Sequence, residues 1–196
     1  LKVRNYKLIL VGMVFVFLFQ AIWFLASLGI GGHLEFFSFP SLRGYESYAV
    51  WSSILLAFAL YVVFAVFGAF VEEVTFRGYV QSRIASRYGH IMGVLIASLL
   101  FSLEHIHIFQ WNWIEKFFQT QFIYVLCFSI FVGYLFFKSK EDVWSVFAFH
   151  ALMNLFNISL PIKVTYTFPI ATQLVTIMSF MLMILILRLL PIKEVL

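Results

Sequence analysis

The segment from Glu72 to Arg77 places three ionisable side chains directly after a long apolar run. The run, residues 48–71, contains no charged residue, and its composition is that of a membrane span. A charged side chain at the centre of a bilayer costs roughly 2.5 to 3.5 kcal/mol on insertion scales. The grouping of Glu72, Glu73 and Arg77 therefore indicates either side chains that neutralise one another or side chains that do chemistry.

Helical spacing separates the roles that are open to the two glutamates. Glu73 and Arg77 are four residues apart, so they share one face of a helix and can form an ion pair that makes burial tolerable. Glu72 is turned by about 100° from Glu73. Glu72 is thus left without a partner, which makes it the candidate general base.

Other polar groups interrupt apolar segments later in the chain. His105 lies near the far end of one segment, and His150 and Asn154 lie one helical turn apart in another. A carboxylate near a histidine can deprotonate water for attack on a peptide carbonyl. A histidine and an amide on one helix face are suitable donors to the oxyanion that then develops.

The composition predicts a membrane protein. Of the 196 residues, 63% are hydrophobic and 11% are charged, and the mean hydropathy is +1.00. These values lie outside the range of soluble globular proteins. We expect an all-α, polytopic membrane helical bundle that forms a single integral-membrane domain over residues 1–196, without a soluble catalytic domain. The basic residues flank apolar segments, which argues against a nucleic-acid partner.

Window analysis predicts six transmembrane helices. The first follows Lys2, Arg4 and Lys7 without a small-residue cleavage site, so we expect an uncleaved first span. Glycines and Pro40 mark the segment after it as a loop. The predicted spans are residues 8–28, 48–71, 91–109, 117–137, 143–160 and 168–190.

The distribution of Lys and Arg predicts the orientation of these spans. With the N-terminus inside, the outer side holds only Arg43, Lys116 and Lys163. Because basic residues favour the cytoplasmic side, we expect both termini in the cytoplasm. The cytoplasmic side then holds Lys2, Arg4, Lys7, Arg77, Arg83, Arg87, Lys138, Lys140, Arg188 and Lys193.

Glu72 and His105 can reach one depth if the chain turns at Gly89. They are 17 and 16 residues from Gly89, so at about 1.5 Å per residue both lie about 24 to 26 Å from the turn on antiparallel helices. This arrangement needs one helix over residues 48–87, which is far longer than a span. We expect a break or kink in it at Gly68.

The same helical rise places the second pair of candidates. His150 and Asn154 lie about 10 and 16 Å from the start of their span near Val143. All four candidate residues can therefore converge within the membrane.

Three motifs carry a resemblance to a known family. They stand in this order in separate apolar segments, within residues 48–160, and they resemble those of the CAAX protease and bacteriocin-processing (CPBP) family. The motifs are Glu72-Glu73-x-x-x-Arg77, Phe101-x-x-x-His105 and His150-x-x-x-Asn154.

The resemblance implies a glutamic-type intramembrane endopeptidase related to the prenyl-protein CAAX endopeptidases. In that family's mechanism, the residues matching Glu72 and His105 activate a water, and those matching His150 and Asn154 hold the oxyanion. It also implies a membrane-associated peptide or protein as substrate and the plasma membrane of a prokaryote as the location. No residue pattern encodes prenyl recognition.

Several alternatives stay open. The resemblance also covers non-proteolytic bacteriocin-immunity or interaction proteins. Glu72, His105 and His150 could instead hold a zinc ion with a water in the fourth position, although we expect no metal. Membrane Glu and His residues also serve proton pathways, but the chain shows no inverted repeat. Cys127 is a small packing residue, since no base accompanies it.

The predicted topology is testable with reporter fusions. A reporter fused after the last residue should be active only on the cytoplasmic side, because ten of the 13 basic residues lie there. A C-terminal reporter that scores as external would contradict the prediction.

Overall fold

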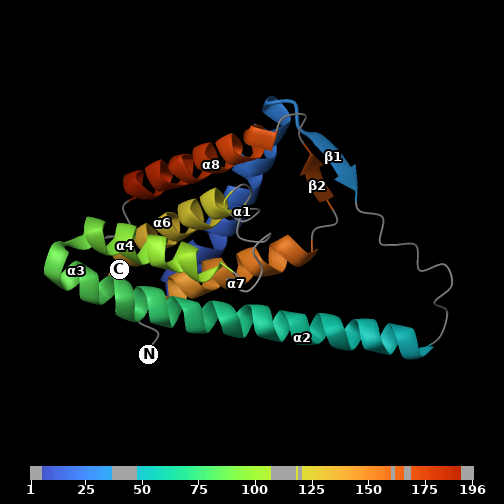
Figure 1. The fold of residues 1–196 in the computed structure, drawn as a ribbon, viewed down its shortest axis with the longest axis horizontal. Helices are drawn as coiled ribbons and strands as arrows, with labels where there is room; N and C mark the ends of the chain where they lie inside the picture. Colours follow the sequence, from blue (N-terminus) through green and yellow to red (C-terminus); the bar gives the residue numbers. More distant parts are fainter. Residues whose placement is uncertain are drawn as a thin grey trace.

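The computed structural model describes residues 6–36, 48–106, 118, 121–159, 162–165 and 169–190. These residues form a bundle of helices with one short two-stranded ribbon at an end (Figure 1). The elements are α1 (Tyr6–Gly29), β1 (His33–Phe36), α2 (Tyr48–Glu73), the π-helix η1 (Val74–Gln81), α3 (Ser82–Tyr88), α4 (His90–Glu104), α6 (Phe122–Lys138), α7 (Val143–Ser159), β2 (Ile162–Thr165) and α8 (Pro169–Leu189).

The helices follow the apolar segments of the sequence, but the prediction of six spans is met only in part. Among the described residues, α1 and residues 170–189 of α8 are long and apolar enough to cross a membrane. The apolar helices α4 and α6 have 15 and 17 residues. At about 1.5 Å per residue they are shorter than the ~30 Å hydrocarbon core of a bilayer.

The ribbon was not predicted. β1 pairs antiparallel with β2, with His33 opposite Thr165 and Phe36 opposite Ile162. Each strand has four residues in which apolar and polar residues alternate, a pattern typical of strands. Four residues are too few to distinguish this period from a loop, so the sequence alone predicts connections between spans at these segments.

One long helical element carries the first motif. α2, η1 and α3 follow one another without a break from Tyr48 to Tyr88. The chain then turns at Gly89, whose φ of +85° favours glycine, and α4 returns alongside α3 and η1. This confirms the predicted turn and the antiparallel neighbour of the motif helix.

The predicted position of the irregularity in this helix was wrong. α2 continues as a regular α-helix through Gly68, and the departure is the eight-residue π-helix from Val74 to Gln81. A glycine alone is tolerated within a membrane helix, where its backbone bonds persist. In the wider turn, the hydroxyl of Ser82 donates to the carbonyl of Arg77 at 3.0 Å.

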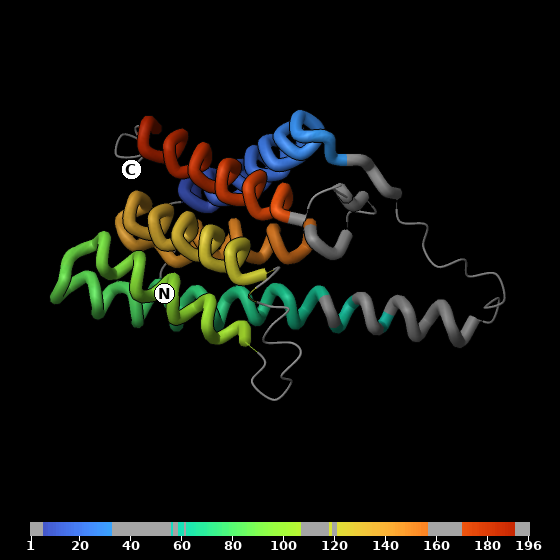
Figure 2. Tube along the Cα trace, turned by 45° about the horizontal axis from the view of Figure 1, so that its top comes forward, coloured from blue at the N-terminus to red at the C-terminus, as the bar shows by residue number. Residues whose placement is uncertain are grey.

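The remaining helices pack around an aromatic core. α1 contacts α7 and α8, α6 contacts α4 and α8, and α7 also lies along α2 (Figure 2). Phenylalanines fill the space between them: the rings of Phe19 and Phe180 stack with centroids 4.4 Å apart, and those of Phe131 and Phe149 lie 5.0 Å apart. These contacts join α1, α6, α7 and α8 into one body.

Small residues allow close approach at two helix crossings. Gly12 of α1 lies directly against the backbone carbonyl of Ser145 in α7. A Cβ on Gly93 of α4 would lie 2.8 Å from the Cβ of Ala85 in α3. Without a strong hydrophobic driving force in lipid, such close packing is a main source of helix association.

Six of the eight described basic residues gather at one end of the bundle; of the other two, Arg77 is buried in the interior and Lys163 lies on β2. This end holds the start of α1, the α3–α4 turn, the α6–α7 turn and the end of α8 (Figure 1). The residues concerned are Lys7, Arg83, Arg87, Lys138, Lys140 and Arg188.

The α1–α7 contact gives a stability test. Replacing Gly12 with Ala should lower the unfolding temperature of the purified protein in detergent by several degrees, because overpacking costs about 1 to 3 kcal/mol. Gly29→Ala on the same helix is the matched control, since a Cβ there meets no atom within 4 Å. Equal unfolding temperatures for the two variants would contradict this account of the crossing.

Candidate active site

A buried ion pair forms the base of the site. Arg77 Nη1 donates to Glu73 Oε1 at 3.2 Å, and Arg77 Nε lies 3.2 Å from Glu73 Oε2. The exposed fraction is 1% for the Arg77 side chain and 0% for that of Glu73. The ion pair expected from the i, i+4 spacing is therefore present, and it lies where α2 passes into η1.

Two further groups complete the surroundings of Arg77. Its Nη2 donates to both the backbone carbonyl and the hydroxyl of Ser129 in α6, at 3.2 and 2.8 Å. The ring of Phe101 in α4 lies under the guanidinium, with the centroid 4.5 Å from Cζ. Arg77 thus ties the motif helix to α4 and α6, and its donors are bonded rather than left bare in an apolar interior.

His150 lies between the two glutamates. Its Nδ1 is 2.7 Å from Glu73 Oε1, and its Nε2 is 3.7 Å from Glu72 Oε2. The sequence predicted neither contact, because it assigned Glu73 to Arg77 alone and Glu72 to His105. Phe128 and Phe101 meet the imidazole edge to face, with centroids 4.9 and 6.0 Å away, and these rings limit how it can turn.

The partners of Glu73 fix the tautomer of His150. A carboxylate that receives two contacts from Arg77 is ionised and can only accept, so His150 Nδ1 carries a proton. Because His150 Nδ1 is held by Glu73, Nε2 is the ring atom that faces Glu72.

Glu72 has the character of a reactive group. Its side chain is 31% exposed, in contrast to the fully buried Glu73. Its Oε2 is buried and has no hydrogen-bond partner among the described residues. An acceptor in this state is suited to taking a water, since buried polar atoms are otherwise bonded.

Three of the four predicted catalytic residues line one cavity. His105, His150 and Asn154 line a cavity of about 310 Å³. Glu72 is not one of its lining residues, but its Oε2 lies 3.7 Å from Nε2 of His150, which is. His105 Nδ1 is 2.8 Å from the carbonyl of Phe101, and since a carbonyl only accepts, the neutral ring presents its lone pair on Nε2. The His105 ring lies beyond ion-pair distance of Glu72.

Asn154 is held in place from the motif helix. Its Nδ2 donates to the carbonyl of Ala65 in α2 at 3.3 Å. An amide has two N–H groups, so one donor remains for the cavity. His150 and Asn154 therefore line the same cavity, as their i, i+4 spacing predicted.

Several residues of the site were missed by the sequence interpretation. Ser129 and Phe128 lie in an apolar segment that was interpreted only as a span, and Gln121 and Tyr124 line the cavity from the start of α6. A signal existed for Ser129, which is a polar residue inside an apolar run. No local pattern marks Phe128, since the segment is rich in phenylalanine.

A zinc site at Glu72, His105 and His150 is not formed by the described side chains. They contain no group of three or more His, Cys, Asp or Glu arranged to hold a metal ion. Both ring nitrogens of His150 already face carboxylates. His107 lies outside the described residues, and Cys127 is half-buried in α6.

Comparison with known families finds a match over the central part of the chain. The family model described as "Type II CAAX prenyl endopeptidase Rce1-like" matches residues 53–156, more than half of the chain. The matched region contains the three motifs and every residue described above for the site. No curated protein and no solved structure matches the chain.

The Glu73–Arg77 pair predicts a non-additive effect on stability. Arg77→Met should destabilise the protein by about 3 to 5 kcal/mol, because it leaves a buried carboxylate without its partner. Combining Arg77→Met with Glu73→Gln should recover part of that loss. Unfolding temperatures of the two single variants and the double variant in detergent measure the coupling. Additive losses would contradict the mutual neutralisation of the pair.

Proposed function

The chain belongs to the type II CAAX prenyl endopeptidase Rce1-like family of membrane-embedded proteases, and from that membership we propose that it hydrolyses a peptide bond of a membrane-associated protein or peptide. Glu72 is the general base of this reaction, and no resident metal takes part. The observation that carries the proposal is the buried, unbonded Oε2 of Glu72, 3.7 Å from His150 Nε2 at the edge of the cavity.

The reaction begins with a water bound at Glu72. The Glu72 carboxylate takes a proton from the water while the water oxygen attacks the carbonyl carbon of the substrate. His105 faces the same cavity and presents the lone pair of Nε2, which can accept the second hydrogen bond of that water. Glu72 and His105 thus act on one water without touching each other.

The negative charge that develops on the carbonyl oxygen is held by two donors. His150 and Asn154 line the cavity. A protonated His150 Nε2 and the second N–H of Asn154 are the donors of this proposal, and fixed donors are most effective where water is excluded. The bond between the carbonyl carbon and the nitrogen then breaks, and the proton on Glu72 passes to the leaving amine. The reaction returns Glu72 to its ionised form.

Glu73 and Arg77 position this apparatus. Glu73 holds the His150 ring by Nδ1, and Arg77 keeps Glu73 ionised. The proton on Nδ1 directs Nε2 towards Glu72 and the cavity. Neither residue needs to touch the substrate.

The expected location follows from the family and the charge distribution. The protein is an integral membrane protein, and we place it in the plasma membrane of a prokaryote with both termini in the cytoplasm. Its partners are the lipid bilayer and a membrane-associated polypeptide.

Substitution of the base tests the function. Glu72→Gln should reduce cleavage of membrane peptides by at least 1,000-fold while the protein still inserts and unfolds at the same temperature, because the amide cannot accept the proton of water. The measurement is peptide release by the purified protein in detergent without any ion gradient, with substrates taken from comparative proteomics of cells carrying wild-type protein or Glu72→Gln.

Glu104→Gln is the matched control, since Glu104 is an exposed carboxylate at the end of α4 outside the cavity lining. Cleavage that persists in Glu72→Gln would refute its role as base. Loss of activity with a chelator and recovery with zinc would favour a zinc-dependent mechanism. A protective bacteriocin-immunity effect that survives Glu72→Ala would favour the non-proteolytic alternative.

A further inference from the structure

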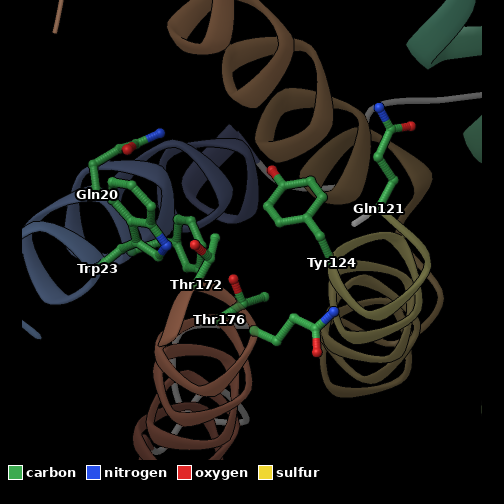
Figure 3. Close-up of a pocket in the computed structure, with 8 residues that line it drawn as sticks. Gln20, Trp23, Gln121, Tyr124, Thr172 and Thr176 are labelled. Atoms are coloured by element: carbon green, nitrogen blue, oxygen red, sulfur yellow. The ribbon is translucent and has the colours of Figure 1, made fainter. Parts of the chain in front are cut away.

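A second cavity adjoins the candidate active site. It has a volume of about 240 Å³ and lies between α1, α6 and α8 (Figure 3). Gln121 and Tyr124 line both this cavity and the one at His150. A third link is Gln20, whose Nε2 lies 3.8 Å from the sulfur of Met153, a residue of the catalytic cavity.

The lining of this second cavity is uncharged and combines polar with aromatic side chains, and the larger part of its surface is apolar. It contains three glutamines, two threonines and a tyrosine, and no described lining residue carries a charge. Figure 3 shows these side chains converging from three helices around one space. The lining consists of Phe19, Gln20, Trp23, Gln121, Tyr124, Thr172, Gln173 and Thr176.

Such a lining is unusual inside an apolar bundle, and it points to a particular ligand chemistry. A glutamine amide presents one acceptor and two donors, and so matches the alternating C=O and N–H groups of a peptide backbone. An unbonded peptide group costs several kcal/mol in an apolar medium, so a polypeptide entering the bundle needs such partners. A phosphate or a carboxylate would find no cation in this lining.

We propose that this α1/α6/α8 cavity is a substrate subsite that binds an uncharged, hydrogen-bonding stretch of the polypeptide next to the cleaved bond. The inference rests on the proposed hydrolysis for the role of the neighbouring cavity. The second cavity alone is smaller than ligand sites of about 300 to 1,000 Å³, but together with the adjoining cavity at His150 it falls within that range. The subsite selects substrates by excluding charge, because a charged side chain there would be desolvated without a counter-ion.

Binding to an inactive protein separates the subsite from catalysis. Glu72→Gln protein in lipid nanodiscs is titrated with fluorescent decapeptides, acetylated at the N-terminus and amidated at the C-terminus. One series contains only Gly, Ser, Thr, Asn and Gln, and two further series carry two Asp or two Lys. We expect the neutral series to bind about tenfold more tightly than either charged series.

Two conservative substitutions then test the cavity itself. Gln20→Met with Thr172→Val keeps the side-chain volumes but removes an amide and a hydroxyl, and it should weaken binding of the neutral series about tenfold, the loss expected for two hydrogen bonds. Leu25→Met with Ile170→Val changes exposed positions on the same two helices and should leave binding unchanged. Equal affinity for all series, unchanged binding by the first double variant, or no binding at all would overturn the subsite.

A photo-crosslinking experiment avoids variants of the cavity. A neutral decapeptide with a central benzoylphenylalanine should crosslink to α1, α6 or α8, and crosslinks confined to α2 and α4 would overturn the proposal. Wild-type protein that cleaves no peptide, while the Glu72→Gln protein shows the expected binding, would refute hydrolysis and support the subsite. Cleavage without the charge selectivity would refute the subsite alone.

Discussion

The hydrogen bond between Glu73 and His150 is the interaction on which the site depends. It joins residues 77 positions apart in sequence and ties α2 to α7 at the level of the cavity. Glu73 can act in this way only because Arg77 balances its charge, and Arg77 can be buried only because Ser129 and Phe101 surround it. In this series of contacts, each group makes the burial of the next one tolerable in an apolar interior.

The backbone passes from an α-helix to a π-helix at Glu73, where this series of contacts begins. η1 starts at the residue after Glu73, and Arg77 lies in its middle. π-turns are rare overall, but those that occur are frequently found at functional sites. Their wider turn alters the direction of side chains relative to an α-helix. Here η1 contacts α4 and α6 as well as α7, so Arg77 lies within reach of partners on several helices.

The sequence predicted the parts of the site that depend on local spacing. The Glu73–Arg77 pair and the turn at Gly89 follow from helical geometry and from the backbone freedom of glycine, and both are present. The partner of His150 could not be predicted, because which glutamate it meets depends on the rotation of α7 against α2, set by packing. The same limit applies to η1, whose residues carry no breaker other than Gly78.

The fold shows the same division between local and long-range information. Hydrophobic runs mark where helices lie, and the described helices coincide with them. Strand pairing between residues 33–36 and 162–165 joins segments far apart in the chain, and four-residue strands leave little local pattern. The cavity linings likewise combine residues from several helices, so their polar members look like isolated interruptions in the sequence.

The length of the motif helix links the candidate base to the thickness of the membrane. From Tyr48 to Tyr88 it spans 41 residues, about 60 Å, twice the hydrocarbon core of a bilayer, and the N-terminal end of its first half extends beyond the other helices (Figure 1). Exposed Leu56, Phe64 and Phe67 on this half require lipid around them. Such a rod must tilt to reduce hydrophobic mismatch, and Glu72 lies near its midpoint. Because the helix is continuous, the thickness of the bilayer bears on the depth and direction of Glu72, the candidate base.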